Sequence, residues 1–131
     1  MSSQRTSPFT AVAAETIAIN RFVNLAGTTA NQALKCSIAD TTETVFGVSD
    51  NGGSSGDVIS IITTGYEAML EVDGSGTAIA AGDFLKPDGG SAGKGIKAAS
   101  DKDAYGAMAL EPSSADGDII RVLVLTGYLA A

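Results

Sequence analysis

The chain has 131 residues, enough for one ordinary domain with a single hydrophobic core. Its 15 acidic and 8 basic side chains give a net charge of −7, which argues against a nucleic-acid partner, because phosphate binding depends on clustered Lys and Arg. With no His, the chain lacks the commonest general base and metal ligand, and its single Cys36 excludes an internal disulfide. Abundant Gly (16) with only 3 Pro favours short strands and tight turns, so we expect a mainly β fold.

The N-terminal residues are polar and show neither helix nor strand periodicity. We interpret residues 1–13 as an extended arm, which either stays solvated or becomes ordered on a neighbouring subunit. Arg5, Pro8 and Phe9 are its candidate contact residues, because an aromatic ring beside a proline in a polar segment is suited to insertion into a partner.

Beyond the arm, the chain reads as a succession of strands. A strand-like pattern leads from residue 11 to a turn at 26–28, and further strands are predicted at 33–38, 44–48, 58–63, 67–73 and 119–125. In 67–73, Ala68, Leu70 and Val72 alternate with outward Glu residues, as in a half-exposed strand. The last strand is apolar on both faces except for Arg121, which predicts a core on one side and, on the other, self-association or docking onto a larger surface.

The same unit occurs twice, about sixty residues apart. The matching segments are 16–23 with 78–85, 46–48 with 105–107, 56–61 with 117–122, and 64–66 with 126–128. We therefore expect a single β domain, 14–131, whose units 14–73 and 74–131 share one core as a compact β-barrel or β-sandwich. The second unit lacks the strand that follows Tyr66 in the first, so the N-terminal segment or another chain would complete its edge. The predicted core residues are Ile17, Phe22, Ile59, Ile61, Phe84, Ile120, Val122 and Val124.

The sequence offers no catalytic, cofactor or metal motif. Three Gly-Asp pairs, at 56–57, 82–83 and 117–118, are typical of turns in which Gly takes a positive φ and Asp accepts backbone hydrogen bonds. Loop 89–95 fails the spacing of a phosphate-binding loop, and no acidic loop continues into a calcium-binding EF-hand pattern. The longest apolar run, 122–125, is too short to cross a bilayer. We expect neither an enzyme nor a membrane partner.

Two residues of the C-terminal strand complete the candidate interface. Arg121, alone on an apolar strand, is expected to pair with an acid at a subunit edge; the alternative is that it extends to water. Tyr128, in the second Thr-Gly-Tyr segment, is the other candidate.

The ordered set of motifs resembles the capsid decoration, or cement, proteins of tailed bacteriophages. The resemblance runs from about Glu15 to Leu125, and the longer polar start departs from the family pattern. The segments that carry it are 26–27, 46–48, 56–61, Gly65, 78–85 with Asp88, 106–109 and 117–118. It implies a compact β protein on the outer surface of a mature phage head, bridging subunits of the major capsid protein and stabilising the shell.

Several alternatives stay open at this point. A carbohydrate-binding adhesion module on a virion or cell surface is the second interpretation, although the chain has no Trp and few aromatic residues. A small β-barrel enzyme is the third, with the missing His as the main objection. For self-association, a homotrimer is favoured because three-fold gaps of a shell are natural docking points, with a homodimer next.

Overall fold

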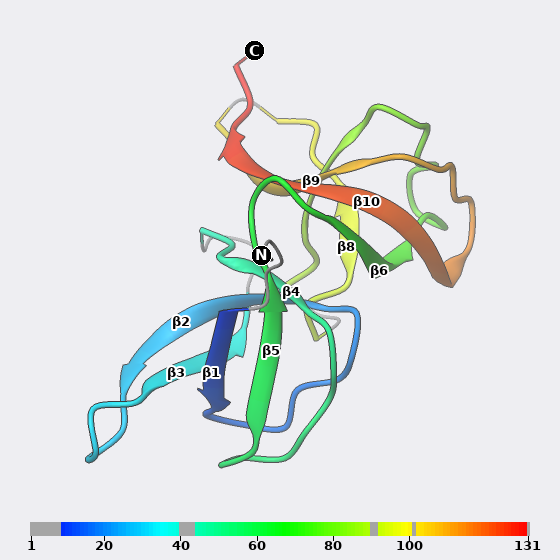
Figure 1. Ribbon diagram of the computed structural model, residues 1–131. Coiled ribbons are helices and arrows are strands. Elements are labelled where there is room, and N and C mark those ends of the chain that lie inside the picture. Colours follow the sequence, from blue (N-terminus) through cyan, green and yellow to red (C-terminus); the bar gives the residue numbers. More distant parts are fainter. Residues whose placement is uncertain (1–8, 40–43, 90–91, 101, 131) are drawn as a thin grey trace, which may run out of the picture.

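The computed structural model describes residues 9–39, 44–89, 92–100 and 102–130 (Figure 1). Within these ranges the chain forms ten strands and no helix, which confirms the mainly β fold. The strands are β1 (Phe9–Ala13), β2 (Phe22–Thr28), β3 (Leu34–Ile38), β4 (Gly47–Ser49), β5 (Val58–Ile62), β6 (Glu67–Asp73), β7 (Phe84–Pro87), β8 (Gly95–Lys97), β9 (Ala104–Ala109) and β10 (Asp116–Tyr128).

The strands close into two five-stranded barrels that follow one another along the chain. Barrel 1 has the strand order β1-β3-β2-β4-β5, and barrel 2 has the order β10-β6-β8-β7-β9. In each barrel the first strand pairs in parallel with the third, and the other four pairings are antiparallel. In Figure 1 barrel 1 lies below barrel 2.

The barrels match strand for strand, which confirms that the chain contains two similar units. Their correspondence is clearest in two sets of cross-strand partners. Across β2, β4 and β5, the partners are Phe22, Val48 and Ile62, which we call row 1. Across β7, β9 and β10, they are Phe84, Met108 and Leu123, which we call row 2. The two rows therefore occupy equivalent positions on their barrels.

The boundary between the units lies one strand earlier than predicted. Segment 67–73, assigned to the first unit, forms β6, which pairs with β10 and β8 and so belongs to barrel 2. The second unit thus has five strands of its own, and because its sheet closes, it has no edge for another segment to complete. The pairings also match 46–48 with 106–108, one residue later than the sequence alignment placed them.

The predicted arm, 1–13, is too long. Phe9–Ala13 form β1, which pairs antiparallel with β5 and in parallel with β3. The side chains of Ala11 and Ala13 are buried in barrel 1. The sequence suggested an arm because five residues of alternating pattern are too few to distinguish from a tail. Residues 1–8 lie outside the described part of the chain.

Two hydrophobic clusters replace the single shared core that we predicted. One lies inside barrel 1 and includes Val23 and Cys36. The other fills barrel 2 and also takes in Phe22, Val45 and Val48 from the first unit. Each unit closes its own sheet around its own interior, yet barrel 1 contributes side chains to the second cluster, so the two barrels pack as one body.

Most of the predicted core residues are buried, and Phe84 is the exception. Its ring lies half-buried on the outside of β7 and stacks on Tyr105, with ring centroids 4.3 Å apart. The sequence could not distinguish it from Phe22, its equivalent in barrel 1, which is fully buried.

Strand β10 buries one face within this chain, as predicted for the core side, and the cover of its other face by a second subunit or a larger surface stays a prediction. Ile120, Val122 and Val124 point into barrel 2 and are buried. The other face points outward, where Ile119 is 49% exposed. Its apolar character therefore marks a surface and not a second core.

Candidate functional site

Two of the three carboxylates that follow glycine accept backbone hydrogen bonds in turns, and the third, Asp118, accepts a hydrogen bond from the hydroxyl of Ser113. Asp57 accepts a hydrogen bond from the backbone N–H of Ser54 at 2.8 Å, and Asp83 accepts one from Ala80 at 2.8 Å. The glycines before them have φ values of 95° and 94°. This arrangement confirms the predicted turn chemistry at these two positions.

The described residues show few features of a metal, membrane or catalytic site. Among the described residues, no three His, Cys, Asp or Glu side chains are grouped so that they could hold a metal ion. No helix in the described ranges is long and apolar enough to cross a membrane. Cys36 is buried in barrel 1, and this burial raises the pKa of its thiol, as for a small core residue.

The predicted arm contacts divide between described and undescribed residues. Arg5 and Pro8 lie outside the described residues. Phe9 is half-buried, and its ring meets that of Phe46 edge-to-face, with centroids 4.9 Å apart. Both rings pack against the core of barrel 1, so the ring of Phe9 is held by its own barrel instead of projecting from an arm.

Arg121 pairs with acids of its own chain. Its guanidinium lies 3.4 Å from a carboxylate oxygen of Glu67 and 3.9 Å from one of Glu111. The backbone N–H of Arg121 also donates to Glu111 at 2.7 Å. The predicted pairing with an acid is thus confirmed, whereas its place at a subunit edge stays a prediction. All three side chains are exposed, so each pair contributes at most about 1 kcal/mol.

Tyr128 ends β10 and is 63% exposed. Its hydroxyl lies 3.5 Å from the hydroxyl of Thr44. Arg121 stands seven residues earlier on the same strand, a separation of roughly 20 Å at the rise of an extended chain. The predicted contact residues that the structure describes therefore do not form a single site.

The contact between the barrels is the best-built feature of the molecule, and the sequence analysis missed it. Phe22 of barrel 1 projects against two glycines of barrel 2. A Cβ atom added to Gly106 would lie 2.9 Å from the Phe22 ring and 2.7 Å from Val45, and one added to Gly95 would lie 3.4 Å from the same ring and 2.7 Å from Leu70. The two glycines thus leave the space that the ring fills. We call this arrangement the Phe22 socket.

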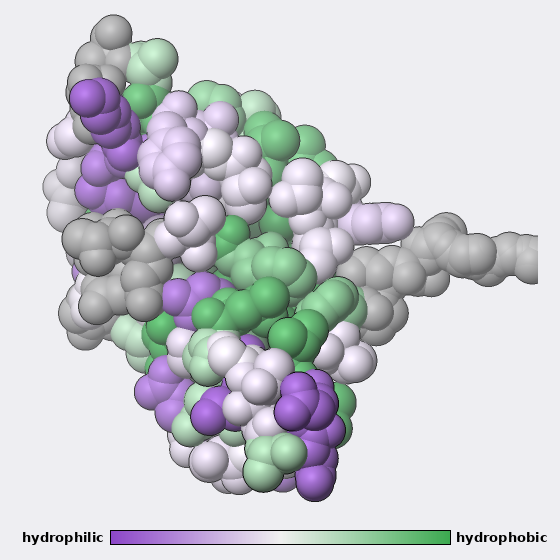
Figure 2. Space-filling view, turned by 90° about the vertical axis from the view of Figure 1, so that its left-hand side faces the viewer, coloured by the Kyte–Doolittle hydropathy of each residue, from purple (hydrophilic) through white to green (hydrophobic). Residues whose placement is uncertain are grey.

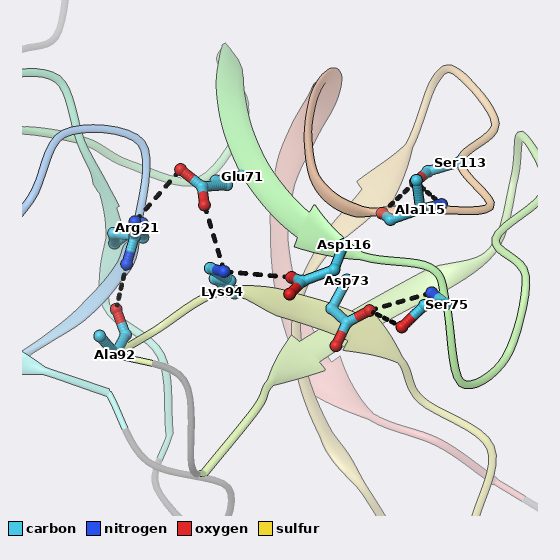
Figure 3. A network of polar contacts seen from close by, with 9 residues as sticks. All are labelled: Arg21, Glu71, Asp73, Ser75, Ala92, Lys94, Ser113, Ala115 and Asp116. Atoms are coloured by element: carbon cyan, nitrogen blue, oxygen red, sulfur yellow. Dashed lines mark hydrogen bonds and ion pairs between the residues drawn. The ribbon is translucent and has the colours of Figure 1, made fainter.

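A polar network borders the Phe22 socket, and Figure 3 shows its members. Arg21 donates to a carboxylate oxygen of Glu71 at 3.1 Å and to the carbonyl of Ala92 at 3.2 Å. Lys94 lies 3.3 Å from the other oxygen of Glu71 and 3.1 Å from Asp116. The contacts of Arg21 join the residue before β2 to two segments of barrel 2, and Lys94 links those segments to Asp116. These charge-assisted contacts fix how the barrels are oriented.

Backbone hydrogen bonds reinforce the same contact. The N–H of Glu71 donates to the carbonyl of Asn20 at 2.8 Å, and the N–H of Phe22 donates to that of Gly93 at 2.9 Å. Gly65, in the connection between the barrels, donates to Val124 at 2.8 Å. Such directional bonds leave little freedom for one barrel to rotate against the other.

Two carboxyl groups of barrel 2 have lowered pKa values. The hydroxyl and the backbone N–H of Ser75 donate to Asp73 and lower the pKa of its carboxyl group (Figure 3). The N–H of Ser100, with the ammonium of Lys86 at 3.1 Å, lowers the pKa of Asp103. These hydrogen bonds stabilise turns. A catalytic acid would instead be expected to have a raised pKa.

The described surface has hollows of moderate size, and one of about 350 Å³ is lined by Ala78, Ile79, Pro112, Ser113, Ser114 and Asp118. A hollow of about 210 Å³ lies between the barrels. It is lined by Asp50, Ile62, Glu67, Ala68, Met69 and Arg121. Figure 2 shows that on one face of the molecule apolar side chains gather at mid-height, between the two barrels.

Fold and surfaces together define a rigid tandem of two β-barrels. No model of a known protein family matches the chain, and no curated protein sequence matches it. Among solved structures, the fold is similar to the crystal structure of the head fiber gp8.5 N base in bacteriophage phi29. The TM-score is 0.71 with 16% sequence identity, over 95% of this chain and 98% of that chain. At this identity the likeness concerns the fold.

Proposed function

We propose that this protein is a structural component of a bacteriophage virion: a decoration or cement protein that binds the outer surface of the mature head. The observation that supports this most is the end-to-end fold similarity to a phage head fiber base. The order of sequence motifs points to the same class of protein independently. In this role the chain is not an enzyme and needs no cofactor, and its partner is the major capsid protein.

The packing of the two barrels suits a bridging role. A protein that holds two neighbouring capsid subunits together must resist bending between its contact sites. The Phe22 socket and the network of Arg21, Glu71 and Lys94 supply this stiffness. Because such a protein binds the assembled, mature shell and not its dissociated subunits, mass action stabilises the shell. Modest contacts suffice when symmetry repeats them, and self-association adds avidity. A homotrimer, or next a homodimer, would supply this linkage.

Co-sedimentation tests the proposal. The purified protein is mixed with expanded, decoration-free heads and, in parallel, with unexpanded proheads of the phage whose genome carries this sequence. We expect saturable binding to the expanded heads alone, because maturation creates the binding site. Binding to neither particle contradicts the proposal and favours the carbohydrate-binding adhesion module, for which a glycan array is the next assay.

A further inference from the structure

A side-chain amide completes the sheet of barrel 1 where β4 ends. The backbone N–H of Asp50 still donates to the carbonyl of Ser60 on β5, at 2.8 Å. At the next residue the side chain of Asn51 takes the place of the backbone. Its Oδ1 accepts from the N–H of Ser60 at 2.7 Å, and its Nδ2 donates to the carbonyl of Val58 at 3.1 Å. The two bonds together require one acceptor and one donor, which an amide supplies.

The equivalent position of barrel 2 carries an acid. The backbone N–H of Leu110 donates to the carbonyl of Arg121 at 2.9 Å, as Asp50 donates to β5 in barrel 1. Glu111 therefore corresponds to Asn51, and its carboxylate likewise accepts a hydrogen bond from the backbone of β10, from the N–H of Arg121 at 2.7 Å. Its other oxygen lies 3.9 Å from the guanidinium of Arg121. In barrel 2 a negative charge at this position is thus paired with a cation.

The residue after Asn51 makes its amide chemically reactive. Gly52 follows Asn51, and no other asparagine of the chain precedes a glycine. An asparagine loses its amide without an enzyme when the next backbone nitrogen attacks Cγ and expels ammonia, and glycine allows this best because no Cβ crowds the attack. Water then opens the cyclic imide at either carbonyl and leaves aspartate or isoaspartate. The net reaction converts an amide and water into a carboxylate and ammonium.

We propose that the side chain of Asn51 is a site of spontaneous covalent modification, which is protected while barrel 1 is closed and whose conversion loosens that barrel. In the closed barrel two hydrogen bonds hold the amide on β5, and rotation of Cγ toward the nitrogen of Gly52 breaks both. The reaction rate therefore follows the population of molecules in which this corner is open. The inference does not depend on the proposed function.

The product lacks the features that make an acid acceptable in barrel 2. After hydrolysis an oxygen replaces Nδ2, so the side chain no longer donates to the carbonyl of Val58 but repels it. The new charge directly follows that of Asp50 along the chain, and the uncharged Ser60 stands where barrel 2 has Arg121. Where isoaspartate forms, the main chain also gains a methylene group before Gly52. The sheet of barrel 1 thus loses a bond at the point where β4 leaves β5.

Peptide mass spectrometry of the purified full chain tests the reaction. Samples are kept at mildly alkaline pH, either folded or unfolded in urea, and the change in mass from amide to acid is followed at each asparagine. In urea we expect Asn51 to convert before Asn20, Asn24 and Asn31, which precede larger residues. In the folded chain its conversion should be at least about tenfold slower. Equal rates in the two conditions, or earlier conversion of another asparagine in urea, would overturn the inference.

Asn51→Asp reproduces one product and tests its consequence. The midpoint of urea unfolding should fall, and Asn51→Asp combined with Ser60→Arg should recover part of the loss, because the arginine copies the pairing of Glu111 in barrel 2. Ser60→Arg alone is the matched control and should give no gain. An unchanged midpoint for Asn51→Asp, or a double variant that recovers nothing, would show that the conversion does not act on barrel 1 in this way.

Discussion

Barrel 1 and barrel 2 share a strand order and a set of pairings, yet their outer faces differ. Phe22 is fully buried in a socket of the neighbouring barrel, whereas its equivalent Phe84 lies half-buried against Tyr105. The difference does not lie in the two phenylalanines but in the barrel that could receive each ring. Barrel 2 has Gly95 and Gly106, which leave room for Phe22, whereas barrel 1 has Cys36 and Phe46 at the equivalent positions. A repeat thus sets topology, and a few small residues decide which copy of a surface is covered.

Removing the buried ring should have the largest effect. Phe22→Ala leaves a cavity in the socket, so the free energy of unfolding should fall by about 3–5 kcal/mol. Phe84→Ala removes a half-buried ring and should cost about 1–2 kcal/mol. Denaturant unfolding followed by circular dichroism measures both. Equal losses would show that the two rings are equally important and would contradict the comparison.

Filling the socket from the other side should come next. Gly106→Ala places a methyl group 2.9 Å from the Phe22 ring and should lower the free energy of unfolding by about 1–3 kcal/mol. Gly76→Ala is the control, because no heavy atom lies within 4 Å of the added methyl group, and its effect should stay within about 0.5 kcal/mol. If both variants behave alike, the space at Gly106 is not what positions Phe22.

The polar network offers a smaller test of the same contact. Arg21→Met removes the bonds to Glu71 and to the carbonyl of Ala92 at a site where the arginine side chain is 14% exposed, so we expect a loss of about 1–2 kcal/mol. Arg121→Met breaks an ion pair whose side chains are more than half exposed, and should cost about 0.5 kcal/mol or less. Thermal unfolding of the two variants under identical salt compares them, and a larger loss at Arg121 would contradict this assignment.

The smallest expected effect concerns acid pH. The pKa of Asp103 is lowered in the folded chain, so its contribution to stability is present above the ordinary value of 3.8 and is lost as the pH falls through the folded pKa. The difference in unfolding free energy between the unmodified chain and Asp103→Asn should therefore shrink once the pH falls below the ordinary value of 3.8. A difference that stays constant from neutral to acid pH would mean that the charge of Asp103 has no role.

Much of the fold could be predicted because the repeat left its trace in turn and strand residues. Phe22 with Phe84, and Gly56 with Gly117, align the two units along the chain. The unit boundary was misplaced because the alternation of 67–73 shows a strand but not its partner, and pairing depends on hydrogen bonds between distant segments.

Less of the candidate site could be predicted. Arg121 stood out because a lone charge on an apolar strand needs a partner, and its acids were found. Phe22 was expected only as a core residue, since its socket depends on Gly95 and Gly106, more than seventy residues later. The sequence does contain the relevant difference, because the second unit has glycines where the first has Cys36 and Phe46. These positions can be matched between the two units only when the strand pairings give the correct register.

Electron cryomicroscopy of expanded heads saturated with the protein tests the central claim most directly. We predict two-barrel density on the outer surface of the shell, in contact with more than one subunit of the major capsid protein. Density confined to another part of the virion, or an outer surface identical to that of undecorated heads, would contradict the assignment as a decoration protein.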